Sequence, residues 1–195
     1  MAEYVPIRNW INCFNGYTQG SRWRTGVGRI HREILSTCSG PDTFVNLCSW
    51  RDDVSQLADT IHEWSDDERR VVCIGYSYGG YTAVLLCREL EKRGIEVAHL
   101  LLIDAVWRYW SKIASPGSLF ENHKIVVPGN VKKVTSWRQR KGKPYGHPVV
   151  VNESKTATDF RTLNVAHAYA DDQLSVRMTA LDAACPSKKE INHDS

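Results

Sequence analysis

Short apolar runs alternate with helical patterns along this chain, and this alternation restricts the possible folds more than any other feature. Four runs are typical of buried strands and two weaker ones follow: WINCFNGY, TFVNLCSW, RRVVCIGY, VAHLLLID, VKKVTSWRQ and DFRTLNV. Strands that are apolar on both faces and alternate with helices favour a parallel sheet that is covered on both sides. We therefore predict the α/β class, with a mostly parallel six-stranded sheet flanked by helices on both faces.

The helices between these strands are predicted from apolar residues spaced three and four apart. Four such faces occur: Ile30, Ile34, Leu35 and Cys38; Val54, Leu57, Ile61 and Trp64; Val84, Leu85, Cys87 and Leu90; and Leu174, Met178 and Leu181. Asp52 or Asp53 suits the start of the second helix, and Asp171 with Asp172 suits the start of the last. Gly94 is expected to end the third helix.

The length and composition indicate one globular domain. A chain of 195 residues with 42% hydrophobic and 24% charged residues can bury a core of its own. We expect residues 1–185 to form a single domain and residues 186–195, PSKKEINHDS, to be a disordered tail. No stretch approaches the ~18 apolar residues of a membrane span, and the start, MAEYVPIRNW, lacks a secretion-signal pattern. These features predict a cytoplasmic protein.

Six cysteines could form disulfides or bind a metal. Cys13, Cys48 and Cys73 lie inside strand-like runs, and Cys38 and Cys87 lie on apolar helix faces. The sequence has no CxxC pair and no histidine and cysteine spacing of the zinc type. This placement predicts that all six cysteines are reduced, as is usual in the cytoplasm. Neither a metal nor a cofactor is expected.

Residues 75–79, GYSYG, match the pattern G-x-S-x-G. An apolar strand precedes the motif and a helix follows it, which is the context that this pattern needs. A serine in so tight a turn has a strained backbone, and the flanking glycines keep neighbouring side chains away. The following helix directs its first amides toward negative charge near the serine. Ser77 is therefore a candidate nucleophile; the alternative is a turn serine that caps the helix.

The motif GYSYGG and the order of the elements around it resemble the α/β-hydrolase superfamily, in particular small serine esterases, lipases and thioesterases. The resemblance extends from about residue 8 to about residue 185. It implies a minimal form of that fold, without its first two strands, and a triad in the chain order Ser, Asp, His. It also implies a small-molecule acyl substrate and cleavage of a carboxylic ester or thioester through an acyl-enzyme. A catalytically inactive binding protein with this fold is the alternative.

Asp104 is the candidate for the triad acid because it ends the strand that follows the Ser77 helix. Reactive groups in open α/β sheets gather at the carboxyl ends of strands. A helix cap or turn aspartate is the alternative, and three other residues compete: Asp159, Asp171 and Asp172.

His167 is the candidate base because it follows the last predicted strand and precedes the last helix. His31 and His62 fall within helices, and His99 starts a strand at the wrong end of the sheet. His123 and His147 fall in loops.

Two backbone amides are expected to hold an oxyanion. One is the N–H of Tyr78, directly after the nucleophile, and the other comes from Gly16 or Tyr17 in the loop FNGYTQG, which lacks the HGGG form. For the acyl group, we expect contacts from Tyr76, Trp107 and Trp110; core packing is the alternative for the two tryptophans.

A basic stretch, VKKVTSWRQRKGK, holds six cations around Trp137: Lys132, Lys133, Arg138, Arg140, Lys141 and Lys143. Most such runs are solvated faces, and the alternative is contact with a phosphate or an acidic surface. The net charge of +3 is mild and does not by itself favour nucleic acid.

Overall fold

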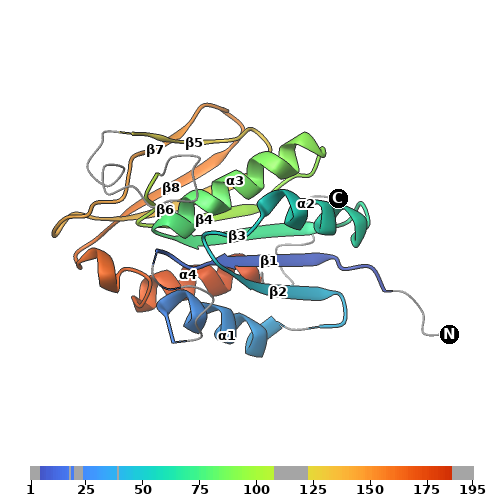
Figure 1. Cartoon of the computed structure of the whole chain (residues 1–195), viewed down its shortest axis with the longest axis horizontal. Helices are drawn as coiled ribbons and strands as arrows, with labels where there is room; N and C mark the ends of the chain where they lie inside the picture. The colour runs from blue at the N-terminus through green and yellow to red at the C-terminus, as the bar shows by residue number, and fades with distance from the viewer. Residues whose placement is uncertain (1–4, 18, 20–23, 39, 108–122, 186–195) are drawn as a thin grey trace.

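Six parallel strands form the main sheet of the computed structural model, which describes residues 5–17, 19, 24–38, 40–107 and 123–185. The strand order is β2-β1-β3-β4-β6-β8 (Figure 1). The strands are β1 (Asn9–Phe14), β2 (Thr43–Cys48), β3 (Arg70–Tyr76), β4 (His99–Ile103), β6 (Lys133–Gln139) and β8 (Ala157–Leu163). Every pairing is parallel. The predicted class and all six predicted strands are confirmed.

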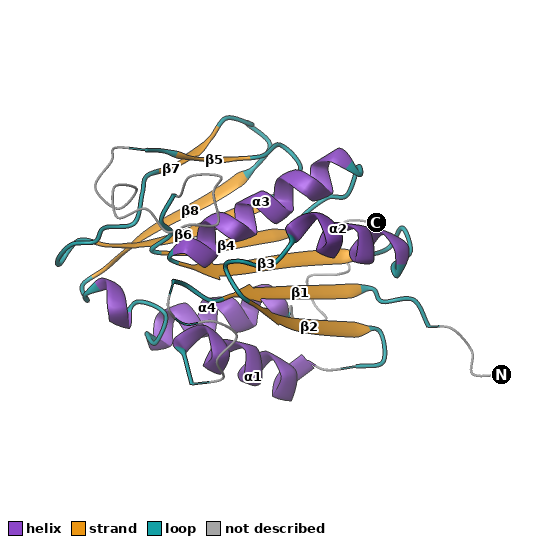
Figure 2. Ribbon diagram, viewed as in Figure 1, coloured by secondary structure: helices purple, strands orange, loops and turns teal. Residues whose placement is uncertain are grey.

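Helices cover both faces of this sheet, as predicted (Figure 2). On one face, α1 (Gly26–Cys38) and α4 (Leu174–Ala184) bury small and branched apolar residues against the strands. On the other, α2 (Val54–Glu63) and α3 (Tyr78–Lys92) do the same. A short 3-10 helix, η2 (His167–Tyr169), precedes α4. The carboxyl ends of all six parallel strands therefore meet at one edge of the sheet, where the connecting loops gather.

A second, two-stranded parallel sheet was not predicted. It pairs β5 (Ile125–Val127) with β7 (Val149–Val151). Ile125 and Val127 are buried in the core that also includes the apolar face of α3. Each strand has only three residues, which is too short for a pattern of alternating exposure to be recognised in the sequence.

The expected start of α2 and end of α3 are confirmed. Gln173, and neither Asp171 nor Asp172, directly precedes α4, and the predicted apolar face of α4 is wrong at Leu174 and Met178. The Asp53 side chain accepts hydrogen bonds from the first turn of α2, and Gly94 follows α3 with a φ of 68°. By contrast, Leu174 and Met178 of α4 are 65% and 50% exposed. The buried face of α4 consists of smaller residues: Val176, Ala180, Ala183 and Ala184. Small side chains allow the helix to pack closely, so the largest apolar residues do not mark its inner face.

A disulfide joins Cys38 at the end of α1 to Cys185 just after α4, with the two Cα atoms 5.7 Å apart. The prediction that all six cysteines are reduced is therefore wrong for this pair, and the argument from cysteines for a cytoplasmic location fails. The two cysteines are separated by 147 positions in the sequence, so no local pattern indicated that α1 and α4 lie side by side. The remaining four cysteines are free and buried. No helix within the described ranges has the length and apolar character to cross a membrane.

Candidate active site

The turn between β3 and α3 holds Ser77 in a strained backbone conformation, with φ 54° and ψ −125°. A positive φ is unusual for a residue other than glycine, and it persists only where surrounding contacts fix it. The Ser77 N–H donates to the carbonyl of Ile103 at 3.0 Å. Its carbonyl accepts from the N–H of Gly80 at 3.0 Å and from that of Val106 at 2.9 Å. The backbone on both sides of the serine is thus fixed by β4 and by α3.

Glycines flank the serine because other chain segments pass too close for a side chain. A Cβ on Gly75 would lie 2.4 Å from the carbonyl oxygen of Gly79. A Cβ on Gly79 would lie 2.4 Å from the carbonyl oxygen of Phe14 in β1. Both contacts are with backbone atoms, which cannot move away cheaply. These two positions therefore require glycine because of neighbouring backbone, whereas crowding by side chains was predicted from the sequence.

Asp104 lies directly after β4, fully buried, with a φ of 43°. Its Oδ1 atom accepts from the N–H groups of Gln139 and Gly146, both at 3.0 Å. Its Oδ2 atom lies 2.6 Å from Nδ1 of His167. A Cβ on Gly146 would lie 2.5 Å from Oδ1, so the loop after β6 wraps closely around the carboxylate. These donors offset the cost of burying a charge.

His167 begins η2 and contacts both other residues. Its Nε2 atom lies 2.9 Å from Oγ of Ser77, and its Nδ1 atom faces Asp104. The partners assign the proton to Nδ1, which donates to the carboxylate, and leave Nε2 to accept from the serine hydroxyl. The structure thus brings together three residues from the carboxyl ends of β3, β4 and β8.

The competing residues make other contacts. Asp159 forms an ion pair with Arg161 on its own strand, at 2.6 Å. Asp172 forms an ion pair with Arg29 at 3.4 Å. His147 accepts at Nδ1 from the N–H of Trp107, at 3.0 Å.

Tyr76 holds the loop that carries His167. Its ring stacks on the imidazole with centroids 5.0 Å apart, and its hydroxyl donates to the His167 carbonyl at 2.8 Å. Burial, together with the charges of Asp171 and Asp104, raises the pKa of this hydroxyl well above its usual value, which keeps it a donor. Only 5% of Tyr76 is exposed, so these contacts position the histidine, and the predicted contact with substrate has little surface available.

The loop after β1 lies against the serine, but its first amide is occupied. A Cβ on Gly16 would lie 3.0 Å from Cβ of Ser77. The Gly16 N–H donates to Oε1 of Gln19 at 2.9 Å. Tyr17 follows, with its ring 5.6 Å from that of Tyr78. Tyr78 begins α3 directly after the serine, so its N–H belongs to the helix N-terminus. Which of these amides receive an oxyanion stays a prediction.

Asp171 competed for the role of triad acid and was also expected to start α4, but its contacts with α1 and with the loop after β1 were not predicted. Its Oδ2 atom accepts from the N–H of Val27 in the first turn of α1, at 3.2 Å, and from Nε2 of Gln19, at 3.3 Å. It therefore connects α1, the loop after β1 and the segment after η2. Burial raises the pKa of this carboxyl above its ordinary value. Gln19 and Asp171 are 152 residues apart, and no local pattern indicates such a contact.

Trp107 and Trp110 are the two tryptophans expected near the acyl group. Trp107 is partly buried, and its ring stacks on that of His123 with centroids 3.7 Å apart. It also packs near Tyr81 of α3, so the core-packing alternative describes part of its surface. Trp110 lies outside the described residues.

One family model matches part of the chain. Residues 46–114 match the thioesterase domain family. The matched range includes Ser77 and Asp104 and ends before His167. This match, with the order of the parallel sheet, agrees with an α/β-hydrolase fold of the thioesterase type and supports an ester or thioester hydrolase.

Solved structures of the NocB thioesterase domain are also similar. One is a covalent complex with a fluorophosphonate nocardicin G analogue, with a TM-score of 0.47, 14% identity, and coverage of 92% of this chain and 96% of that one. The other, described as the NocB thioesterase domain from the nocardicin cluster, has a TM-score of 0.47, 15% identity, and coverage of 91% and 94%. No curated protein matches the chain.

Proposed function

We propose that this protein is a serine hydrolase that cleaves the carboxylic ester or thioester of a small acyl substrate through a Ser77, His167 and Asp104 triad. The observation that carries the proposal is the continuous hydrogen-bonded series from Ser77 Oγ to His167 Nε2, at 2.9 Å, and from His167 Nδ1 to Asp104 Oδ2, at 2.6 Å. The match of residues 46–114 to the thioesterase domain family supports the same reaction class.

In the proposed mechanism, His167 removes the hydroxyl proton as Ser77 attacks the acyl carbonyl. Asp104 holds the imidazole in the required tautomer and stabilises its charged form. Backbone amides near the serine stabilise the oxyanion. His167 then donates its proton to the leaving alkoxide or thiolate. In the second half-reaction, the same imidazole takes a proton from water as the water oxygen attacks the acyl carbon. The bond to Ser77 Oγ then breaks, and His167 returns the proton to that oxygen.

The substitution Ser77→Ala tests this proposal. We expect it to abolish turnover of a short p-nitrophenyl ester and of an acyl thioester, and to abolish labelling by a fluorophosphonate probe, because only an activated serine reacts. Circular dichroism should show a folded variant. Ser36→Ala, an exposed serine on α1, is the matched control and should keep full activity and labelling.

The inactive-binding-protein alternative makes the opposite prediction. A wild-type chain that is folded but neither labelled by the probe nor active on either substrate would favour that alternative. A folded Ser77→Ala variant that keeps most of the activity would place the reaction elsewhere in the molecule.

A further inference from the structure

The basic stretch around Trp137 divides into two groups at opposite ends of β6. Lys132 and Lys133 lie at its amino end, where Lys132 forms an ion pair with Glu96 at 2.9 Å. Arg138 and Arg140 lie at its carboxyl end. Because β6 is parallel to β4, this is the edge of the sheet that carries Asp104. The six cations therefore do not form a single solvated face.

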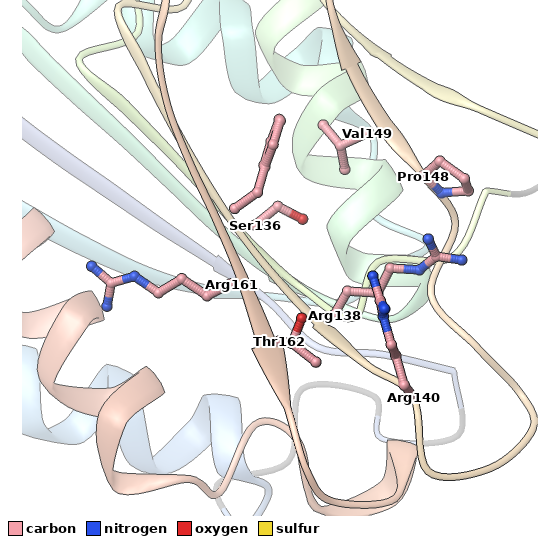
Figure 3. Close-up of a pocket in the computed structure, with 8 residues that line it drawn as sticks. Ser136, Arg138, Arg140, Pro148, Val149, Arg161 and Thr162 are labelled. Carbon is pink, nitrogen blue, oxygen red and sulfur yellow. The ribbon is translucent and has the colours of Figure 1, made fainter.

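A pocket of about 260 Å³ opens beside the second group (Figure 3). Its lining residues come from β6, β8 and the segment that leads into β7: Ser136, Arg138, Arg140, Pro148, Val149, Phe160, Arg161 and Thr162. In the β6–β8 register, Ser136 lies opposite Phe160 and Arg138 lies opposite Thr162. Side chains alternate along strands, so these four share one face of the sheet.

Two arginines in this pocket have no carboxylate partner among the residues that the structure describes. In Figure 3, the guanidinium groups of Arg138 and Arg140 extend toward the side of Pro148, while Arg161 extends the opposite way. Arg161 forms an ion pair with Asp159 and lies over the ring of Trp137. Within the described ranges, neither Arg138 nor Arg140 pairs with a carboxylate, and no acidic residue lines the pocket. An anion between two neighbouring cations would relieve their repulsion.

Arg138 is already fixed in place. Its Nε atom donates to the carbonyl of Gly146 at 2.6 Å, and its side chain is half-buried. This bond restrains the guanidinium group before any ligand arrives, which reduces the entropy lost on binding. The hydroxyl groups of Ser136 and Thr162 are additional donors on the same face.

The remaining lining is apolar. Phe160 is 56% exposed, which is unusual for a large aromatic side chain on a sheet, and Val149 and Pro148 lie across the pocket from β8. A ligand that satisfies both halves of the pocket therefore carries a compact, highly charged anion on one side and an apolar or flat group on the other. A phosphate monoester has these properties, and its oxygens match the fork of an arginine.

We infer that this pocket binds the phosphate group of an organic phosphate monoester between Arg138 and Arg140, with the apolar part of the ligand against Phe160. Ser77, Asp104 and His167 do not line this pocket, and the inference does not rest on the proposed function.

Titration of the full chain with phenyl phosphate, followed by calorimetry and by NMR, tests this inference. We expect saturable binding with a dissociation constant of about 1 mM or tighter, because two charge-assisted contacts form. Inorganic phosphate should bind more weakly, and benzyl alcohol should not bind measurably. Arg140→Gln should lower the affinity for phenyl phosphate at least about tenfold. Phe160→Ala should reduce the affinity for phenyl phosphate to that for inorganic phosphate.

The matched control is Lys133→Gln, which removes the same charge from the other end of β6 and should change the affinity less than about twofold, because screening is strong at that separation. The affinity should be unchanged in Ser77→Ala, which separates this inference from the hydrolase proposal. The inference is overturned by an absence of saturable binding, by equal effects of Arg140→Gln and Lys133→Gln, or by benzyl alcohol binding as tightly as phenyl phosphate.

Discussion

At the scale of single residues, Asp104 is the most constrained side chain of the candidate site. It is fully buried, and it faces His167 with one oxygen and two backbone N–H groups with the other. An aspartate that only ended a turn would not need donors on both oxygens. This arrangement fixes which oxygen faces the imidazole, and it therefore also fixes the direction in which the ring is presented to Ser77.

Asp104→Asn should keep the fold and lower kcat by about ten-thousand-fold, the cost in comparable triads. An amide group facing Nδ1 would favour the tautomer with its proton on Nε2, which cannot accept from the serine. His167→Ala should be similarly severe, and the double variant little worse than either, because the residues act as a unit. Steady-state kinetics on a thioester measure the cycle. Additive losses would mean that the two do not work together, and Asp159 or His147 would then be tested.

His99 should make the protein sensitive to acid. It is buried at the start of β4, 2.9 Å from the hydroxyl of Thr135, and burial, followed by the charges of Lys133 and Arg70, lowers its pKa from 6.5 to about 4. Between pH 4 and 6.5, this histidine therefore binds a proton more readily in the unfolded chain than in the folded one. The contribution of neutral His99 to the free energy of unfolding is fully present above pH 6.5. It is lost as the pH falls toward 4, which lowers the free energy of unfolding by roughly 3 kcal/mol.

His99→Gln keeps a polar partner for Thr135 and should flatten this part of the stability profile, as measured by urea unfolding at several pH values. The exposed His62 gives the matched control, His62→Gln, which should leave the slope unchanged. Identical slopes in wild type and His99→Gln would contradict the assignment of a neutral buried histidine.

At the scale of elements, the turn from β3 into α3 is fixed by close passage of β1. Gly79→Ala should lower the free energy of unfolding by about 2 kcal/mol or more, because the new Cβ would meet the carbonyl oxygens of Phe14 and Asn15 at 2.4 and 2.5 Å. Gly142→Ala is the control, since nothing lies within 4 Å of a Cβ there, and it should change stability by less than about 0.5 kcal/mol. Urea unfolding compares them, and equal stabilities would show that the turn can relax.

The elements also show which parts of the site the sequence could predict. Ser77 was predicted from the G-x-S-x-G pattern between a strand and a helix. Asp104 and His167 were predicted from the rule that reactive groups follow the carboxyl ends of parallel strands, together with the chain order that the family resemblance implies. These signals need only local patterns. No such local signal predicts the contact between Gln19 and Asp171, because it is produced by the packing of loops that are distant in the sequence. The strands β5 and β7 were missed because three residues are too few for a periodic pattern.

At the scale of the whole molecule, the disulfide connects the two helices of one face. Thiol counting under denaturing, non-reducing conditions should find four thiols, because Cys38 and Cys185 are paired. Breaking the bond should lower stability by about 2–5 kcal/mol. Cys38→Ser, Cys185→Ser and the double variant should lose the same amount, since each removes the same bond. A count of six thiols would contradict the pairing.

The order in which the chain is synthesised gives the candidate site a delayed onset of reactivity. Ser77 leaves the ribosome 90 residues before His167, which on the proposed mechanism supplies its base. At about 5–20 residues per second, this interval lasts roughly 5–20 s. A nascent chain that has folded only as far as β4 would present the strained turn with an ordinary, unactivated hydroxyl. The serine would therefore not be activated as a nucleophile until the last strand of the sheet and His167 have been synthesised.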